Sequence, residues 1–344
     1  MRNDVNRRMV LAARPHGMVK DSDFRMEEAP IPVPAEGEVL IRNLYLSFDP
    51  TQRGWMEDRP SYLPPVQIGE PMRAGAVGQV IESKNPNFKP GEIVQGTFGW
   101  VDYLTTSGGG IMPLTKVPAG VPLTAPVSIF GITGLTAYFG MLDLGKPAAG
   151  EVVLVSGAAG ATGSVAGQLA KLMGATVIGT AGGPDKTRWL RETAGFDHAL
   201  DYREGNLTQR IKEIAPKGIN VFFDNVGGEV LEAGLANLAL RARVVLCGGI
   251  SSYNATEPPP GPRNYMQIVI MRARVEGFIV LDYAPRFPEA VVALGKWIAE
   301  GKLITAEDVQ EGLENAPATL RRLFEGRNLG TQILKIAETP LPRI

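Results

Sequence analysis

The pattern of hydrophobic positions changes near residue 128 and divides the chain into two parts. In residues 1–125, short apolar and β-branched runs alternate with clusters of Pro and Gly. The clearest runs are residues 39–46, 76–81, 93–98 and 101–105. Short strands bounded by turn residues predict a compact β-rich domain of barrel type.

Beyond residue 128, apolar runs of strand length alternate with amphipathic stretches of helical period. The expected strands are residues 152–156, 176–180, 198–201, 220–224 and 243–247, and the expected helices are 161–173, 184–193, 207–215 and 229–238. This alternation predicts a doubly wound parallel sheet with helices on both faces. After a Pro-rich loop at residues 257–262, we expect helices at 265–271, 287–300 and 317–324 and strands at 275–280 and 331–336.

Length and charge narrow the class of protein. The 344 residues suffice for two domains, and 35 basic against 36 acidic residues give a net charge of −1. The absence of any basic block argues against a nucleic-acid or anionic-membrane partner. Mean hydropathy is about zero, and no apolar run approaches the ~18 residues of a membrane helix. The charged N-terminal sequence MRNDVNRRMV lacks a secretory signal, so we expect a cytoplasmic location.

Metal ligands and disulfide partners are scarce. Cys247 is the only cysteine, and His16 and His198 are the only histidines. Structural zinc sites take four Cys or His ligands and catalytic sites take three protein ligands, so we expect no Cys/His zinc site. The histidines also lie in different predicted domains without a motif around them, which argues against histidine acid–base chemistry.

The strongest local motif is VVLVSGAAGATGS, residues 152–164. An apolar strand runs into Gly157, Gly160 and Gly163 and then into a helix, which is the arrangement that binds a pyrophosphate at a helix N-terminus. The spacing is GxxGxxG and not GxGxxG, so a glycine turn without a ligand is the alternative.

The end of the second strand bears on the choice of nicotinamide cofactor. An NAD enzyme presents an acidic residue there, about twenty residues beyond the glycine turn. Here residues 181–184 are AGGP, and Lys186 and Arg188 follow, either of which could meet the additional phosphate of NADP. Asp185 and the ordinary solvation of a helical lysine argue the other way. We therefore expect NADPH rather than NADH.

Two further glycine clusters follow strands, DNVGG at 224–228 and CGGISSYN at 247–254. In open α/β sheets these strand ends face the ligand crevice. Asn225 is a candidate ligand-binding residue or a helix N-cap, and Cys247 is expected to be a packing residue. Tyr253 is the candidate proton donor, with a loop-anchoring role as the alternative.

At these residues the chain resembles the zinc-independent medium-chain dehydrogenase/reductase superfamily, in its group of prostaglandin reductases, leukotriene hydroxydehydrogenases and alkenal double-bond reductases. The resemblance covers nearly the whole chain and rests on LYLSFDPTQRG, GITGLTAYFGML, GAAGATGSVAGQLAKLMG, FDNVGGEVLE, CGGISSYN and NLGTQILKI. It implies an α/β protein in which a GroES-like β-rich catalytic domain, residues 1–127 completed by 303–344, accompanies a Rossmann NADP-binding domain, residues 128–302.

The resemblance also implies a set of cofactor contacts. Gly160, Ala161, Thr162 and Gly163 would face the pyrophosphate, Lys186 the 2′-phosphate and Tyr202 the adenosine. The remaining contacts would be Asn225, Cys247, Gly248, Gly249, Ile250, Ser251, Ser252, Tyr253, Phe278, Ile279, Val280 and Asn328.

One position departs from the family pattern. Relatives carry a tyrosine after the Asp-Pro pair and it lines their substrate pocket, whereas this chain has Thr51. Thr51 and Tyr253 are therefore the expected pocket residues, and the smaller side chain leaves the size of the substrate open.

The implied activity is NADPH-dependent, metal-independent reduction of the carbon–carbon double bond of an α,β-unsaturated aldehyde or ketone, by hydride transfer to the β-carbon. Tyr253 and the cofactor ribose hydroxyl would stabilise the charge that develops on the carbonyl oxygen. An NADPH quinone oxidoreductase and a weakly catalytic NADPH-binding sensor are the alternatives. A zinc alcohol dehydrogenase is disfavoured because its ligands are missing.

Relatives are commonly homodimers, and we expect the same of this chain. The apolar strand RVEGFIVL, residues 274–281, is the candidate pairing edge. An ordinary inner strand is the alternative.

Overall fold

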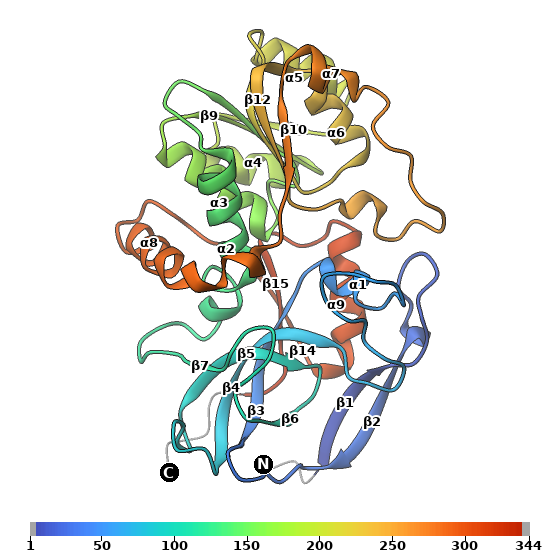
Figure 1. Ribbon diagram of the computed structural model, residues 1–344, viewed down its shortest axis with the longest axis vertical. Coiled ribbons are helices and arrows are strands. Elements are labelled where there is room, and N and C mark those ends of the chain that lie inside the picture. The colour runs from blue at the N-terminus through green and yellow to red at the C-terminus, as the bar shows by residue number, and fades with distance from the viewer. Residues whose placement is uncertain (1–4, 339–344) are drawn as a thin grey trace. The chain divides into compact units, whose positions relative to one another are not determined.

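The structure is a computed structural model that describes residues 5–338. Two compact units are present. The first combines residues 5–131 with 307–338, and the second is Ile132–Ala306. Each is described by itself below, and Figure 1 labels their elements.

The first unit is built on antiparallel strands. A two-stranded ribbon pairs β1 (Val5–Leu11) with β2 (Phe24–Pro30). A seven-stranded sheet has the order β14-β15-β3-β4-β5-β7, with β6 paired to β3. Its strands are β3 (Val39–Phe48), β4 (Arg73–Ser83), β5 (Ile93–Gly99), β6 (Tyr103–Thr106), β7 (Thr115–Lys116), β14 (Glu307–Glu311) and β15 (Thr331–Lys335). The C-terminal segment therefore completes the sheet of the N-terminal one.

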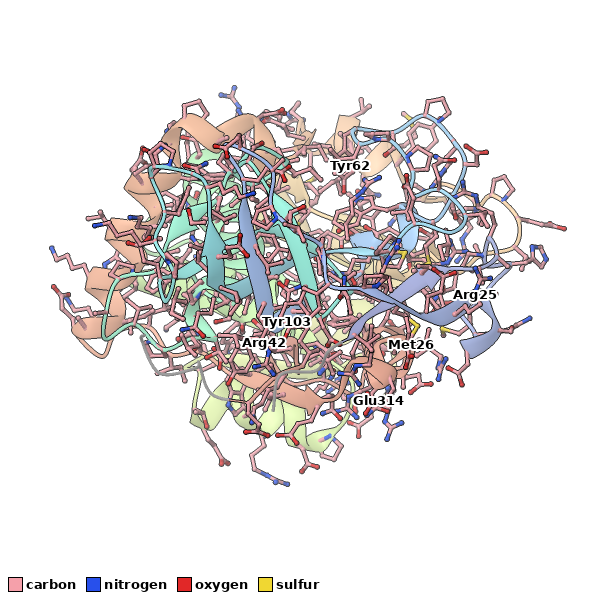
Figure 2. The ribbon with its side chains drawn as sticks, turned by 90° about the horizontal axis from the view of Figure 1, so that it is seen from below. Arg25, Met26, Arg42, Tyr62, Tyr103 and Glu314 are labelled. Carbon is pink, nitrogen blue, oxygen red and sulfur yellow. The ribbon has the colours of Figure 1, made fainter. Side chains whose placement is uncertain are left out.

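The register of this sheet follows the alternation of side chains. Arg42 on β3 faces Tyr103 on β6, and Figure 2 shows the two side chains close together. β15 runs antiparallel to β3 and parallel to β14. Two short helices, α1 (Thr51–Gly54) and α9 (Ala316–Phe324), belong to the same unit.

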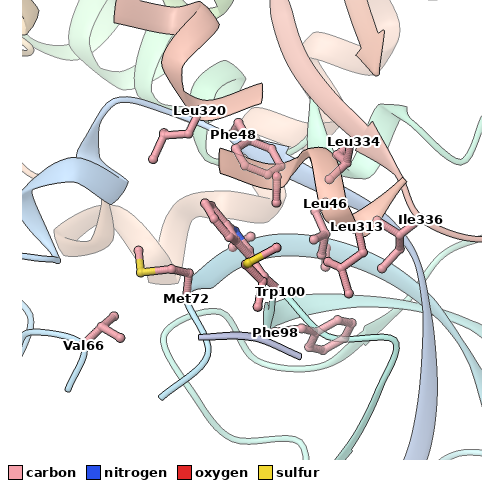
Figure 3. Close-up of a cluster of buried hydrophobic side chains, with 14 of the residues drawn as sticks. Leu46, Phe48, Val66, Met72, Phe98, Trp100, Leu313, Leu320, Leu334 and Ile336 are labelled. Atoms are coloured by element: carbon pink, nitrogen blue, oxygen red, sulfur yellow. The ribbon is translucent and has the colours of Figure 1, made fainter. Parts of the chain in front are cut away.

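The core of the first unit centres on Trp100, which is fully buried. Its ring lies 4.9 Å from that of Phe48 and 5.5 Å from that of Phe24, measured between centroids. Figure 3 shows aliphatic side chains from both chain segments around it, among them Leu46 and Leu334. Burial of this shared cluster holds the C-terminal segment on the N-terminal sheet.

The second unit is a six-stranded parallel sheet of order β10-β9-β8-β11-β12-β13. Figure 1 shows helices on both of its faces. Its strands are β8 (Val152–Val155), β9 (Thr176–Ala181), β10 (His198–Asp201), β11 (Ile219–Asp224), β12 (Leu238–Leu246) and β13 (Arg274–Gly277). The order reverses between β8 and β11, which is the switch point where open α/β sheets bind ligands.

Apart from α2, the helices of this unit fall close to the predicted positions. They are α2 (Ile132–Tyr138), α3 (Ala161–Leu172), α4 (Pro184–Glu192), α5 (Leu207–Ile214), α6 (Gly228–Leu235), α7 (Met266–Ile270) and α8 (Phe287–Ala299). A π-helical segment, Phe139–Gly145, continues α2. The sequence analysis did not anticipate α2 or this segment, because glycines interrupt the helical pattern there.

Three element predictions were wrong in detail. The strand expected at 275–280 ends at Gly277, and a 3₁₀ segment, Val280–Arg286, follows it. The helix expected to reach residue 238 ends at Leu235, because Leu238 already begins β12. The strand expected at 243–247 begins at Leu238 and ends at Leu246, because Arg241 and Arg243 interrupt the apolar run of its early part. Arg241 also has a φ of +61°.

The position of β13 also corrects an expectation. β13 is an edge strand of the parallel sheet, so the alternative that residues 274–281 form an ordinary inner strand was wrong. The sheet leaves the outer edge of β13 without a neighbouring strand of the described chain.

Candidate functional site: the carboxyl edge of the parallel sheet

The glycine-rich turn connects β8 to α3 as the sequence motif predicted. Gly157 has a φ of +58°, a conformation that disfavours side chains. A Cβ on Gly163 would lie 2.4 Å from the Gly157 carbonyl oxygen and 2.9 Å from the Ala158 Cα. The turn therefore packs directly against the first turn of the helix, and only a hydrogen atom fits at position 163.

The N-terminus of α3 is open to a ligand. Gly160 is the N-cap residue, and no described side chain caps the helix. Ala161, Thr162 and Gly163 are its first three residues, whose amides have no partner within an α-helix. Unsatisfied amides and the helix dipole at a glycine turn suit a pyrophosphate.

A buried carboxylate, Asp224, organises the end of β11. It is fully buried and accepts a hydrogen bond of 2.6 Å from the Ser156 hydroxyl at the end of β8. The amides of Val226 and Gly227 also donate to this carboxylate, each at 3.1 Å. Desolvation raises the pKa of Asp224, and these three donors oppose the rise. Asp224 thus ties the ends of two strands to the turn that begins α6.

Asn225 does not cap α6. The N-cap residue is Gly227, so the N-cap expectation for Asn225 was wrong. The Asn225 side-chain amide donates to the Ser156 carbonyl oxygen at 2.7 Å, and its backbone amide donates to the Ser156 hydroxyl at 2.8 Å. The Asp224 carboxylate already accepts the Val226 and Gly227 amides of this turn. The Asn225 side chain therefore bridges β11 to β8 instead of capping the helix.

The loop after β12 folds back on the same edge. The amides of Cys247 and Gly248 donate to the Asp224 carbonyl oxygen at 2.8 and 3.2 Å. The Ser251 hydroxyl donates to the Val226 carbonyl oxygen at 2.6 Å, and the Ser252 hydroxyl to that of Gly249 at 2.8 Å. A 3₁₀ turn, Ile250–Ser252, shapes the loop. These hydrogen bonds fix the backbone of the loop after β12 beside the turn that contains Asn225.

Tyr253 and Cys247 are the side chains of this loop that bear candidate chemical groups. The Gly249 amide donates to the Tyr253 hydroxyl oxygen at 3.2 Å, which ties the phenol to its own loop. Burial, together with the nearby Asp224, raises the pKa of the Cys247 thiol to about 12. The thiol is therefore protonated at neutral pH and is a poor nucleophile.

The ends of β9 and β10 form the neighbouring part of the edge. Gly183, with a φ of +93°, is the N-cap residue of α4, whose first two turns carry Lys186 and Arg188. Arg188 is paired with Asp185 at 3.1 Å. The buried Asp201 carboxylate from β10 accepts the Gly183 amide at 2.8 Å. A search along β9 alone could not find this acid, because it comes from the next strand.

Residues 278–280 follow β13, and the Phe278 ring serves in packing. A Cβ on Gly140 would lie 2.6 Å from this ring, and the Tyr283 ring meets it edge-on at 6.4 Å between centroids. The half-buried ring thus packs against the π-helical segment at Gly140 and against Tyr283.

The structure therefore brings most of the sequence-predicted residues to one edge of the second unit. Thr51 and Asn328 lie in the first unit. The Thr51 hydroxyl donates to the Asp49 carboxylate, whose pKa is raised by desolvation. Asn328 is buried, and its side-chain amide donates to the Gly330 carbonyl oxygen at 2.9 Å.

A parallel sheet with a glycine-rich turn and an open helix N-terminus at its switch point defines a dinucleotide-binding protein. Similarity to known protein families narrows the class of this protein further. Residues 7–114 match the family described as N-terminal domain of oxidoreductase, and residues 161–296 match the family described as zinc-binding dehydrogenase. Within residues 5–338, no group of three or more His, Cys, Asp or Glu side chains is placed to hold a metal ion.

The chain is 42% identical to an NADPH-dependent curcumin reductase of Escherichia coli, over 96% of this chain and 97% of that protein. It is 38% identical to an NADP-dependent 2-alkenal reductase of Nicotiana tabacum, over 96% and 98%. The crystal structure of CurA from Vibrio vulnificus with NADPH superposes with a TM-score of 0.92, at 38% identity over 97% and 100%. The chain belongs to the medium-chain dehydrogenase/reductase superfamily, in the group of prostaglandin, curcumin and alkenal reductases.

Proposed function

We propose that this protein uses NADPH to reduce the carbon–carbon double bond of α,β-unsaturated aldehydes or ketones. The observation that carries the proposal is the glycine turn at the sheet's switch point, built so that only hydrogen fits at Gly163, in a chain similar over its full length to reductases of that kind. No described helix is both long and apolar enough to cross a membrane. A cytoplasmic location is part of the proposal, because the reaction needs a compartment that regenerates NADPH.

The residues at the sheet edge fit the cofactor. Gly160, Ala161, Thr162 and Gly163 would hold its pyrophosphate on the open N-terminus of α3. Lys186 would contact the 2′-phosphate and Tyr202 the adenosine. The other proposed contacts are Asn225, Cys247, Gly248, Gly249, Ile250, Ser251, Ser252, Tyr253, Phe278, Ile279, Val280 and Asn328. We also propose that residues 1–127 with 303–344 form the catalytic domain and that residues 128–302 form the cofactor domain.

When bound, NADPH supplies the hydride that the reaction places on the β-carbon. Negative charge then develops on the substrate carbonyl oxygen, where the protein must present a hydrogen-bond donor, and a proton from solvent completes the reduction at the α-carbon. We assign that donor to the Tyr253 hydroxyl, which the Gly249 amide holds in place at 3.2 Å. Thr51 is the proposed pocket residue of the first unit.

NADPH oxidation followed at 340 nm tests this proposal, with a 2-alkenal, an aryl enone and a quinone as substrates and NADH as the control cofactor. We expect turnover of the alkenal and the enone. The Tyr253→Phe variant should lose about 100-fold in kcat with little change in NADPH affinity, because removing one of the hydrogen-bond donors to a developing oxyanion costs about that much even when a second donor, here the cofactor ribose hydroxyl, remains. Unchanged kcat would remove Tyr253 from this role.

Other results with these three substrates would favour a different function. Turnover of the quinone alone would favour a quinone reductase. NADPH binding without any turnover would favour a cofactor sensor. Either result would overturn the double-bond reductase proposal for this chain.

We also propose a homodimer that pairs through the β13 edge. Four exposed apolar side chains, Tyr265, Met266, Val269 and Ile270, lie on or beside α7, the helix that leads into β13. No residue of α7 is buried. A free parallel edge next to an apolar surface is a typical pairing site for a second copy.

Light scattering after gel filtration tests the dimer. At micromolar concentration we expect twice the 36.9 kDa mass of the chain. The Val269→Glu variant should shift the mass towards that of the monomer, because it places a charge in the apolar contact. A monomeric wild-type protein would contradict the proposal.

A further inference from the structure

Arg203 occupies a position on the sheet edge that the motif analysis did not consider. It lies two residues beyond the end of β10, and its backbone amide donates to the Asp201 carboxylate at 3.0 Å. The same carboxylate accepts the Gly183 amide at 2.8 Å. Asp201 therefore fixes the loop after β9 and the loop after β10 to each other.

The Arg203 guanidinium lies across the first of these loops. A Cβ on Gly182 would meet its Cζ and Nη2 atoms at 3.0 Å and its Nε atom at 3.1 Å. The guanidinium also lies 5.6 Å from the centre of the Tyr202 ring. The absence of a side chain at position 182 thus leaves room for this arginine beside the tyrosine.

The charge of Arg203 is not neutralised by a partner within residues 5–338. The side chain is exposed, and no described carboxylate forms an ion pair with it. Arg188, by contrast, forms an ion pair with the Asp185 carboxylate. Arg210 donates hydrogen bonds to the carbonyl oxygens of Asp201 and Glu204. A cation held over a glycine and an aromatic ring, without a counter-ion, is suited to bind an anion from solution.

We propose that Arg203 binds the 2′-phosphate of NADPH and is the main residue by which this protein distinguishes NADPH from NADH. The inference rests on the proposed NADPH-dependent function. The guanidinium offers a planar fork to two phosphate oxygens, and Lys186 supplies a point charge from the first turns of α4. The Asp201 carboxylate accepts the backbone amides of Gly183 and Arg203 instead of ribose hydroxyls, so it does not favour NADH.

Binding of cofactor fragments tests the inference without depending on any reduction activity. Calorimetric titrations of the whole protein with 2′,5′-ADP and with 5′-AMP compare the two nucleotides, which differ only in the 2′-phosphate. We expect Arg203→Ala to weaken 2′,5′-ADP by about 10 to 100-fold, as for loss of a bidentate charged contact, and to leave 5′-AMP unchanged. Arg191→Gln, which removes an exposed charge near the end of α4, is the matched control and should bind both nucleotides as the wild type does.

Gly182→Ala provides a second variant that changes no charge. Its methyl group would displace the guanidinium, so 2′,5′-ADP should weaken in the same direction but by a smaller factor. In turnover, Arg203→Ala should lower kcat/KM for NADPH and leave that for NADH unchanged. Equal affinity of Arg203→Ala and wild type for 2′,5′-ADP would overturn the inference, as would an equal loss for both nucleotides. Absence of turnover with normal fragment binding would instead count against the proposed function alone.

Discussion

Replacing Gly163 by alanine should weaken NADPH binding by at least about 100-fold. The added Cβ would lie 2.4 Å from the Gly157 carbonyl oxygen and 2.9 Å from the Ala158 Cα, and both atoms belong to the backbone. A backbone contact cannot be relieved by a change of rotamer, so the turn itself must move away from the helix. The amides at the start of α3 would then no longer converge on the pyrophosphate.

Fluorescence titration with NADPH measures this loss, and thermal unfolding shows whether the variant is folded. Gly261→Ala is the matched control, because no atom lies within 4 Å of a Cβ at that position. We expect the control to bind as the wild type does. A folded Gly163→Ala variant whose affinity stays within threefold of wild type would show that the turn does not cradle the phosphates.

The sequence predicted those features that depend on neighbours along the chain. The strand Val152–Val155, the glycine turn and the helix Ala161–Leu172 follow from one continuous pattern of apolar and glycine positions. The parallel order of the sheet follows in turn from the alternation of strands and helices. Local spacing is sufficient here because each element is specified by its own residues.

The features that were missed depend on pairing between distant segments. Asp201 reaches the Gly183 amide because β10 lies beside β9, and a scan along β9 alone does not contain that information. Arg203 is placed over Gly182 by the same pairing. The N-cap alternative for Asn225 followed from its place before a helix, but its side chain bonds to Ser156, directly after the adjacent β8.

One residue that the motif analysis passed over, Asp224, joins these segments. It ends an apolar strand, and the sequence motif placed it beside Asn225 without indicating that it is fully buried. Its carboxylate holds Ser156 from β8 and the turn before α6, while its carbonyl oxygen holds the loop after β12. Three strand ends thus share a single residue, so its removal should disturb all of them.

Replacing Asp224 by alanine should lower the free energy of unfolding by about 3 to 5 kcal/mol. The Ser156 hydroxyl and two turn amides would lose their acceptor inside the protein, and each unsatisfied buried donor costs about 1 to 3 kcal/mol. Asp224→Asn should cost much less, since its carbonyl oxygen can still accept the amides and its NH₂ group can donate to Ser156. Urea unfolding of the three proteins measures the difference.

The same comparison has a defined pH dependence. Burial raises the pKa of Asp224 in the folded state, so its neutral form is favoured there. The stability that this group contributes is therefore fully present below the ordinary aspartate pKa of about 3.9, and it is lost as the pH rises through the folded-state value. The stability of the wild type relative to Asp224→Asn should decline across that interval and then level off. A relative stability that does not change from about pH 4 to 8 would show that folding does not raise the pKa of Asp224. An alanine variant as stable as the wild type would show that Asp224 does not hold the strand ends together.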